Sequence, residues 1–249
     1  MAKTKIDYRC RECGWSTTKW VGQCGNCQAW DSVSEQAPTT KAKPANISQA
    51  NAAKPITEVE VVTDGYQPTT VQEFDRVLGG GLVDGAAILL SGEPGVGKST
   101  LLLEVASRLA KSGKKVLYVS AEESASQVRL RAQRTSALSE NLYLASETDL
   151  GYVLGQFEQL QPDLMVVDSV QTVSSQEIDG AAGMPSQVRE VASNLIRLAK
   201  QNSTPIILVG HVTKDGSIAG PRTLEHLVDV VCHFEGDRQT SLRFVRTLK

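Results

Sequence analysis

A glycine-rich segment, Gly92-Glu-Pro-Gly-Val-Gly-Lys-Ser-Thr100, constrains this chain more than any other part of its sequence. It fits the pattern G-x-x-x-x-G-K-[ST], the phosphate-binding loop of nucleoside triphosphatases. Glycines let the backbone curl until successive N–H groups point inward at a polyphosphate. The lysine can reach the β- and γ-phosphates, and the serine hydroxyl can ligate Mg²⁺. The predicted site for ATP and magnesium comprises Gly92, Glu93, Pro94, Gly95, Val96, Gly97, Lys98, Ser99 and Thr100.

The flanks of this segment suit the motif. The apolar run Ala86–Ser91 before it predicts a buried strand, and Leu101–Ala110 after it is apolar at helical spacing. A helix that opens at Lys98 would direct its N-terminal dipole at the phosphates. The alternative is a glycine turn that binds no ligand, but such a turn gives no packing reason for the Gly-Lys-Ser-Thr ending.

Strand and helix patterns alternate through the rest of the chain, which predicts an α/β fold with a mostly parallel sheet between helices. Further strands are predicted at 114–120, 141–144, 163–168 and 205–210, helices at 124–135, 150–160 and 187–201, and a closing hairpin at 230–235 and 241–247.

Ligands in such sheets bind at the carboxyl ends of the strands, and polar side chains occur there. Asp168 ends an apolar strand in the Walker B pattern and is predicted to hold Mg²⁺. Glu122 or Glu123 could activate the attacking water, and His211 follows another strand. Other interpretations stay open: Asp168 as a helix N-cap, the two glutamates as ordinary helix-start residues, and His211 as a loop histidine.

Two C-x-x-C pairs near the N-terminus, Cys10/Cys13 and Cys24/Cys27, predict a structural zinc site. About 30 residues cannot bury enough apolar surface to fold alone, so a metal would supply the missing free energy. Four thiolates leave no open position on zinc, so the site is not expected to be catalytic. Disulfides or redox thiols are the alternative.

The segment that carries these cysteines, the zinc ribbon, also holds every tryptophan of the chain, Trp15, Trp20 and Trp30. These side chains either pack within the ribbon or stack on DNA bases or a partner. Cys232 lies in an apolar run and is predicted to be a buried strand thiol. The expected organisation is a zinc ribbon at 1–31, a flexible linker at 32–57 and the ATPase domain at 58–249.

Composition adds limits rather than a function. The formal net charge of −2 does not indicate a nucleic-acid binder, so any such contact must come from local patches. No apolar run approaches the roughly 20 residues that span a bilayer, and the first residues lack the apolar core of a signal peptide. We therefore expect a cytoplasmic protein without membrane contact.

Two polar segments, Gln171–Ser186 and Thr213–Pro221, fit no regular element. Long irregular segments inside a compact domain are usually functional, and both follow strands that carry candidate site residues. Lys214 and Arg222 would give the second segment phosphate contacts. Surface loops without a ligand are the alternative.

Taken together, these motifs resemble one family, the bacterial RadA (or Sms) DNA repair proteins, which are RecA-like ATPases. The resemblance covers nearly the whole chain. It is carried by the four cysteines and by Phe74–Leu82, Gly92–Thr100, Tyr118–Ser124 and Gly210–Arg222.

The resemblance implies a DNA-dependent, helicase-like motor that forms hexameric rings on single-stranded DNA and drives branch migration beside the RecA recombinase. It makes Glu122 the water-activating member of the acidic pair and His211 the γ-phosphate sensor. It also makes Gln171–Ser186 and Thr213–Pro221 the two DNA-facing loops.

The family continues with a Lys-Asn-Arg-Phe-Gly motif, of which Lys249 resembles the first residue, and then with a domain that resembles Lon protease without its catalytic apparatus. Without them we expect weak ATPase activity, impaired ring formation and no branch migration, while nucleotide binding survives. Two other functions stay open: a KaiC-type regulatory ATP-binding module that acts on protein partners, and a zinc-ribbon scaffold with a degenerate ATPase.

Overall fold

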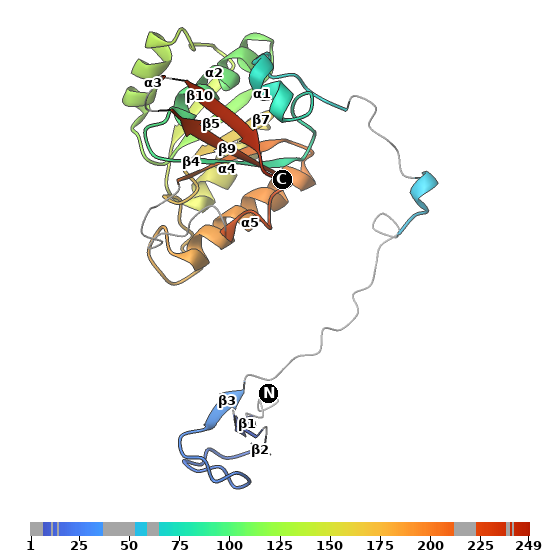
Figure 1. Ribbon diagram of the computed structural model, residues 1–249, viewed down its shortest axis with the longest axis vertical. Coiled ribbons are helices and arrows are strands. Elements are labelled where there is room, and N and C mark those ends of the chain that lie inside the picture. The colour runs from blue at the N-terminus through green and yellow to red at the C-terminus, as the bar shows by residue number, and fades with distance from the viewer. Residues whose placement is uncertain are drawn as a thin grey trace. The chain divides into compact units, whose positions relative to one another are not determined.

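The computed structural model of the protein describes residues 7–10, 12–13, 15–36, 53–58, 65–211, 223–237, 240 and 242–249. The chain divides into two compact units, residues 1–61 and 62–249, each described here by itself (Figure 1). Among the helices in these ranges, none has the length and apolar character needed to cross a membrane.

A seven-stranded sheet organises the larger unit, in the order β10-β9-β4-β8-β7-β5-β6. All neighbours pair in parallel except β9 and β10, which form an antiparallel hairpin. The strands are β4 Ala87–Gly92, β5 Val116–Ser120, β6 Leu142–Ser146, β7 Leu164–Asp168, β8 Ile206–His211, β9 Val230–Gly236 and β10 Arg243–Thr247. Every residue of β4, β5 and β7 is buried, as expected for parallel strands covered on both faces.

Helices cover both faces of this sheet, and Figure 1 shows the resulting three layers. One apolar cluster joins the sheet to α4 and α5, and a second joins the opposite face to α1, α2 and α3. The helices are α1 Gln72–Val77, α2 Lys98–Lys111, α3 Ala125–Arg134, α4 Leu150–Leu160 and α5 Pro185–Gln201. Successive residues of a strand therefore contribute to different cores, which fixes the strand register.

The smaller unit contains a three-stranded antiparallel sheet in the order β2-β1-β3. Its strands are β1 Asp7–Cys10, β2 Ser16–Thr17 and β3 Val33–Gln36, and a short 3-10 helix, η2, spans Ile56–Glu58. Among its described residues, Cys10, Cys24 and Val33 form the buried apolar cluster, and Tyr8, Trp15 and Val21 pack against it partly buried. An apolar core of three residues is too small to hold this sheet together by itself.

The α/β prediction is confirmed, and each predicted strand and helix of the larger unit occurs within a few residues of its expected bounds. The predicted ribbon boundary at residue 31 is wrong, because Val33–Gln36 pairs with β1 through the whole length of that strand. This strand was not predicted because residues 34–36 are polar and show no apolar pattern. Most of the predicted linker, and the whole predicted loop Thr213–Pro221, lie outside the described residues.

Candidate nucleotide site and zinc ribbon

The glycine-rich segment joins the central strand β4 to helix α2, as the motif requires. Gly95 and Gly97 have φ angles of 78° and 111°, which favour glycine. At Gly92 a Cβ atom would lie 2.3 Å from the carbonyl oxygen of Phe234, so only glycine fits there. The loop is thus shaped by backbone requirements, and it ends at the start of α2, where a helix N-terminus favours an anion.

Lys98 opens α2 and is buried at its first turn. Its ammonium donates to the carbonyl oxygens of Gly92 and Glu93, at 2.8 and 2.9 Å. Burial lowers the pKa of Lys98, and the charges of Asp168 and Glu122 act in the opposite direction. The lysine charge therefore lies inside the loop, within electrostatic reach of both candidate carboxylates.

Asp168 ends β7 and is 7% exposed. The buried phenol of Tyr118, on the adjacent strand β5, donates to its Oδ2 at 2.7 Å. Burial raises the pKa of Tyr118 well above its usual value, and the charge of Asp168 raises it further, so the phenol remains a donor. No helix begins next to Asp168, since α5 starts at Pro185, so the N-cap interpretation is wrong.

Glu122 lies just beyond the end of β5, where two side chains meet its Oε1 atom. The Ser169 hydroxyl donates to it, and His211 Nε2, from the end of β8, lies 3.1 Å away. The histidine contact does most to lower the pKa of Glu122, burial opposes it, and the Ser169 hydrogen bond and the Lys98 charge assist. Glu122 is therefore an ionised carboxylate fixed between β7 and β8.

The His211 contact is electrostatic rather than a well-aligned hydrogen bond. Among the described residues neither ring nitrogen of His211 has a hydrogen-bond partner, although both are buried. The imidazole at the end of β8 is partly buried, its Nε2 faces Glu122, and its Nδ1 has no hydrogen-bond partner among the described residues.

The neighbouring Glu123 faces a different environment. Its carboxylate forms an ion pair with Arg131 of α3, and its backbone N–H donates to the Ser120 hydroxyl. Glu122 contacts the strand ends that carry Asp168 and His211, whereas Glu123 contacts a helix. The two glutamates, equivalent in the sequence, are thus separated by their contacts.

Gln171 connects the segments that follow β7 and β8. Its side-chain oxygen accepts from the His211 backbone N–H at 2.7 Å, and its amide nitrogen donates to the His211 carbonyl at 2.9 Å. The backbone N–H of Val170 donates to Val209 beside it. His211 is therefore held at its backbone by the loop that starts after Asp168.

The predicted loop Gln171–Ser186 is irregular up to Met184, and its last two residues belong to α5. The side chain of Gln187 accepts from Ser175 and donates to the carbonyls of Ser175, Ile178 and Gly180, which fixes the loop from inside. The loop carries two carboxylates and no lysine or arginine, so it offers no cationic side chain to a phosphate.

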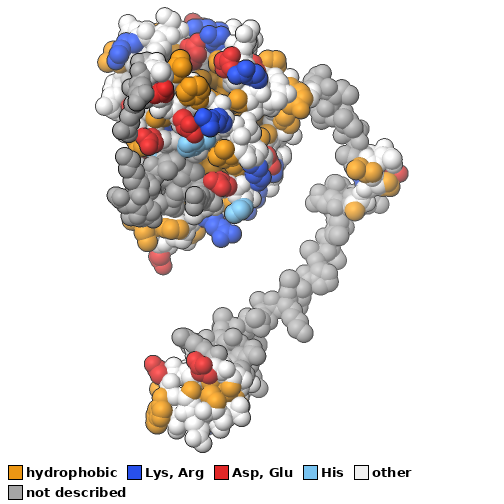
Figure 2. Space-filling model, viewed as in Figure 1, with side chains coloured by type: hydrophobic (Ala, Val, Ile, Leu, Met, Phe, Trp, Pro, Cys, Tyr) orange, Lys and Arg blue, Asp and Glu red, His pale blue; other side chains and the backbone are white. Residues whose placement is uncertain are grey.

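The basic candidates of the other loop, Lys214 and Arg222, lie outside the described residues. On the described part of the face in Figure 2, lysine and arginine side chains are interspersed with acidic ones and form no broad basic area. Any DNA contact on this face would therefore have to come from a local set of residues.

The smaller unit brings its four cysteines together. Their Sγ atoms all lie within 4.8 Å of one another, with Cys10–Cys27 at 3.7 Å and Cys13–Cys24 at 3.5 Å. A zinc ion with Zn–S bonds of about 2.3 Å needs sulfur atoms about 3.8 Å apart, so the cluster fits a tetrahedral Cys₄ zinc-binding site.

Two thiols of the cluster differ in acidity. Although its contact with the Ala29 backbone lowers it, the neighbouring thiols and burial raise the pKa of Cys27 to about 12. The side chain of Ser32, whose Oγ lies 3.3 Å from the Cys10 sulfur, does most to lower the pKa of that thiol to about 6. The cysteines are not joined by disulfides. A thiol that loses its proton readily is suited to bind a metal.

The three tryptophans differ in burial, and the packing role is confirmed for Trp15 alone. Trp15 packs against the cysteine cluster, whereas Trp20 and Trp30 are 63% and 74% exposed. Cys232 is fully buried in β9, as predicted, and burial raises its thiol pKa to about 11.

Three residues next to the site escaped the sequence analysis: Tyr118, Ser169 and Gln171. Ser169 and Gln171 follow Asp168 within three positions, so their place after a Walker B strand was the available signal. Tyr118 reads as an ordinary apolar strand residue, and only the register between β5 and β7 reveals its bond to Asp168.

Two family models match the chain. One, described as an AAA domain, matches residues 52–217, and the other, described as a rubredoxin metal binding domain, matches residues 8–35. The first covers the phosphate loop, both acidic positions and His211, and the second covers the Cys₄ cluster.

Similar proteins and structures agree with these matches. The DNA repair protein RadA of Mycolicibacterium smegmatis is 52% identical over 258 residues, covering 100% of this chain and 55% of that protein. RadA of Bacillus subtilis is 44% identical over 257 residues, covering 100% and 56%. The chain thus spans about half the length of these relatives. A KaiC-like protein from Pyrococcus horikoshii, 18% identical, matches 74% of this chain and 88% of its own with a TM-score of 0.58, which shows a shared fold.

Proposed function

The chain belongs to the AAA domain family, and from this premise we propose that it supplies the ATPase of a RecA-like DNA-repair motor, which binds single-stranded DNA and drives branch migration. One observation carries the ATPase proposal. Lys98 opens α2 behind the phosphate loop, and Asp168, Glu122 and His211 converge beside it from the ends of three strands, β7, β5 and β8. The relatives named DNA repair protein RadA support the biological process.

In this proposal each residue has a distinct role. The loop N–H groups bind the polyphosphate, and Lys98 exchanges its two carbonyl partners for phosphate oxygens. Ser99 and Asp168 hold Mg²⁺, which neutralises charge that develops on the phosphates. Glu122, held ionised by His211 and Ser169, orients and deprotonates the attacking water.

His211 would report the state of the γ-phosphate. It is the last residue of β8, and its buried ring lies beside Glu122. Its backbone forms two hydrogen bonds with the Gln171 side chain, so a shift of the histidine would displace the start of the loop that follows β7. Coupling of this kind links hydrolysis to movement of a bound partner.

The DNA contacts belong to the same proposal. Lys214 and Arg222 supply positive charge to the segment after His211, which favours a phosphate backbone. The resemblance to RadA proteins suggests two partners, single-stranded DNA and the RecA recombinase. It also suggests that the protein assembles into a hexameric ring.

Steady-state ATP hydrolysis tests the site. Lys98→Ala should lower turnover by at least about 100-fold with an unchanged circular dichroism spectrum, whereas Lys111→Ala, at the far end of the same helix, should retain it. Glu122→Gln should abolish turnover and Glu123→Gln should retain it, because only Glu122 contacts His211. Equal losses in the two glutamate variants would contradict the assigned base.

The motor function needs a separate measurement. Hydrolysis should rise when single-stranded DNA is added, and the stimulation should weaken as salt increases. ATP hydrolysis that ignores DNA, combined with nucleotide-dependent binding of a protein partner, would replace the motor with a KaiC-type regulatory module.

A further inference from the structure

Tyr118 makes a contact that the ATPase mechanism leaves unexplained. It lies on β5 opposite Val166 of β7 and is almost completely buried. Its hydroxyl extends past this partner and donates to Asp168 Oδ2 at 2.7 Å. A buried tyrosine needs a hydrogen-bond partner, and here the partner is the carboxylate assigned to magnesium.

The contact is selective for one oxygen of that carboxylate. Among the described residues Tyr118 is the one side chain that donates to Asp168, and it leaves Oδ1 without a hydrogen bond. A carboxylate fixed through one oxygen presents the other in a set direction. Outer hydrogen bonds of this kind orient metal ligands, and their loss typically costs 10–100-fold in metal affinity.

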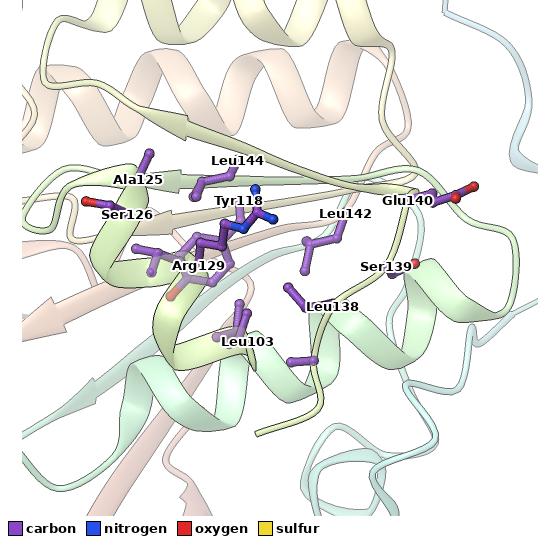
Figure 3. A pocket seen from close by; sticks show the side chains of 13 residues that line it. Leu103, Tyr118, Ala125, Ser126, Arg129, Leu138, Ser139, Glu140, Leu142 and Leu144 are labelled. Carbon is purple, nitrogen blue, oxygen red and sulfur yellow. The ribbon is translucent and has the colours of Figure 1, made fainter. Parts of the chain in front are cut away.

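The Tyr118 ring belongs to the apolar cluster on the α1, α2 and α3 side of the sheet and is 1% exposed. Tyr118 lines an apolar pocket of about 700 Å³ between α2, α3 and β6. Figure 3 shows the ring among Leu103, Arg129 and Leu144, which come from those three elements. The hydroxyl's bond to Asp168 is the one directional contact that the Tyr118 side chain makes among the described residues.

We propose that Tyr118 is a positioning residue for the magnesium site: its hydroxyl holds Asp168 so that Oδ1 faces the metal, and this sets the Mg²⁺ concentration that nucleotide binding requires. The inference rests on the proposed role of Asp168 as a magnesium ligand. Tyr118 itself touches neither nucleotide nor metal in this scheme.

The test is binding of a fluorescent ADP analogue to the chain, titrated with Mg²⁺. Tyr118→Phe removes one oxygen atom and keeps the ring. It should raise the Mg²⁺ concentration at half-maximal enhancement of binding about tenfold, while the affinity measured without Mg²⁺ stays that of the wild type. Tyr143→Phe removes an exposed hydroxyl from the neighbouring strand β6 and should change neither value.

A second control separates positioning from loss of stability. Leu144→Ala enlarges the same pocket and lowers the thermal midpoint but leaves the hydroxyl in place. It should keep the wild-type Mg²⁺ midpoint. An equal shift in Leu144→Ala and Tyr118→Phe, or a loss of affinity in Tyr118→Phe that is the same with and without Mg²⁺, would overturn the proposal.

Asp168→Asn distinguishes this inference from the function on which it rests. If the Mg²⁺ effect disappears in Asp168→Asn but is unaltered in Tyr118→Phe, the positioning role is wrong and the magnesium assignment stands. If the wild type and Asp168→Asn respond to Mg²⁺ alike, the assignment of Asp168 fails and the role of Tyr118 fails with it.

Discussion

The two units of this protein solve the problem of stability in different ways. The larger unit buries apolar clusters on both faces of a seven-stranded sheet, whereas the buried apolar cluster in the described part of the smaller unit is Cys10, Cys24 and Val33. Burial of apolar surface can stabilise the first, but the second needs the cross-link that a metal provides. A short segment can therefore adopt one folded structure without a large apolar core when its metal ligands determine that structure.

The largest expected effect is on the ribbon. Cys13→Ser removes one of four zinc ligands and should abolish the folded state of residues up to Gln36, because metal binding and folding are one process there. Zinc content should fall, and amide exchange should become fast in β1 and β3 but not in β4. Cys232→Ala is the control, since Cys232 is buried in β9 and should leave zinc content unchanged. If the ribbon amides of Cys13→Ser remained protected from exchange, the ribbon would not depend on zinc for its folding.

The reciprocal change addresses the sheet. Leu89 is fully buried in the central strand, so Leu89→Ala should lower the free energy of unfolding of the larger unit by about 3 kcal/mol. Urea unfolding monitored by circular dichroism measures it, and zinc content should equal that of the wild type. Loss of zinc in this variant would show that the units depend on each other.

A smaller, local effect is expected at Gln187, whose buried amide holds the loop after β7 from inside. Gln187→Ala leaves the backbone groups of Ser175 and Ile178 without this partner and should cost about 1–3 kcal/mol. Amide exchange should accelerate at residues 175–180 and remain slow in β7. Gln159→Ala, an exposed glutamine of α4, should have no such effect.

The smallest effect concerns the start of β9. Burial tends to raise the pKa of Asp229, but the N–H of Ala87 and the ammonium of Lys200 lower it overall. A carboxyl whose pKa is lower in the folded state stabilises the protein above its unfolded pKa and loses this contribution as pH falls through the folded value. Asp229→Asn should therefore cost less than about 1 kcal/mol at pH 7.

The pH dependence provides the check on Asp229. The difference in unfolding free energy between wild type and Asp229→Asn should shrink as pH falls below about 4. A difference that is the same at pH 7 and pH 3 would show that the contact is steric rather than electrostatic.

Features of the fold and the site could be predicted from the sequence when a short run of residues determines them. The phosphate loop, the Walker B strand and the cysteine pairs are short patterns whose residue types follow from one chemical need, and all lie where they were expected. The extent of the ribbon was missed because β3 is polar and is defined by its pairing with β1.

The partners of the site residues were not predictable for the same reason. Glu122 and Glu123 are adjacent and identical in type, and only the positions of His211 and Arg131 separate them. The bond from Tyr118 to Asp168 depends on the register between two strands that are 43 residues or more apart in sequence. Such contacts follow from the assembled sheet and have no local signature.

The position of β4 in the sheet has a consequence for the order in which the molecule folds. This strand occurs early in the chain but lies between β8 and β9, which come more than 100 residues later. On the ribosome, the first half of the larger unit therefore emerges with its middle strand still lacking both neighbours. The glycine-rich loop after β4 is therefore synthesised early but acquires its final shape late, because β4 must wait for β8 and β9. The cysteine ribbon, in contrast, can fold as soon as Gln36 has left the exit tunnel.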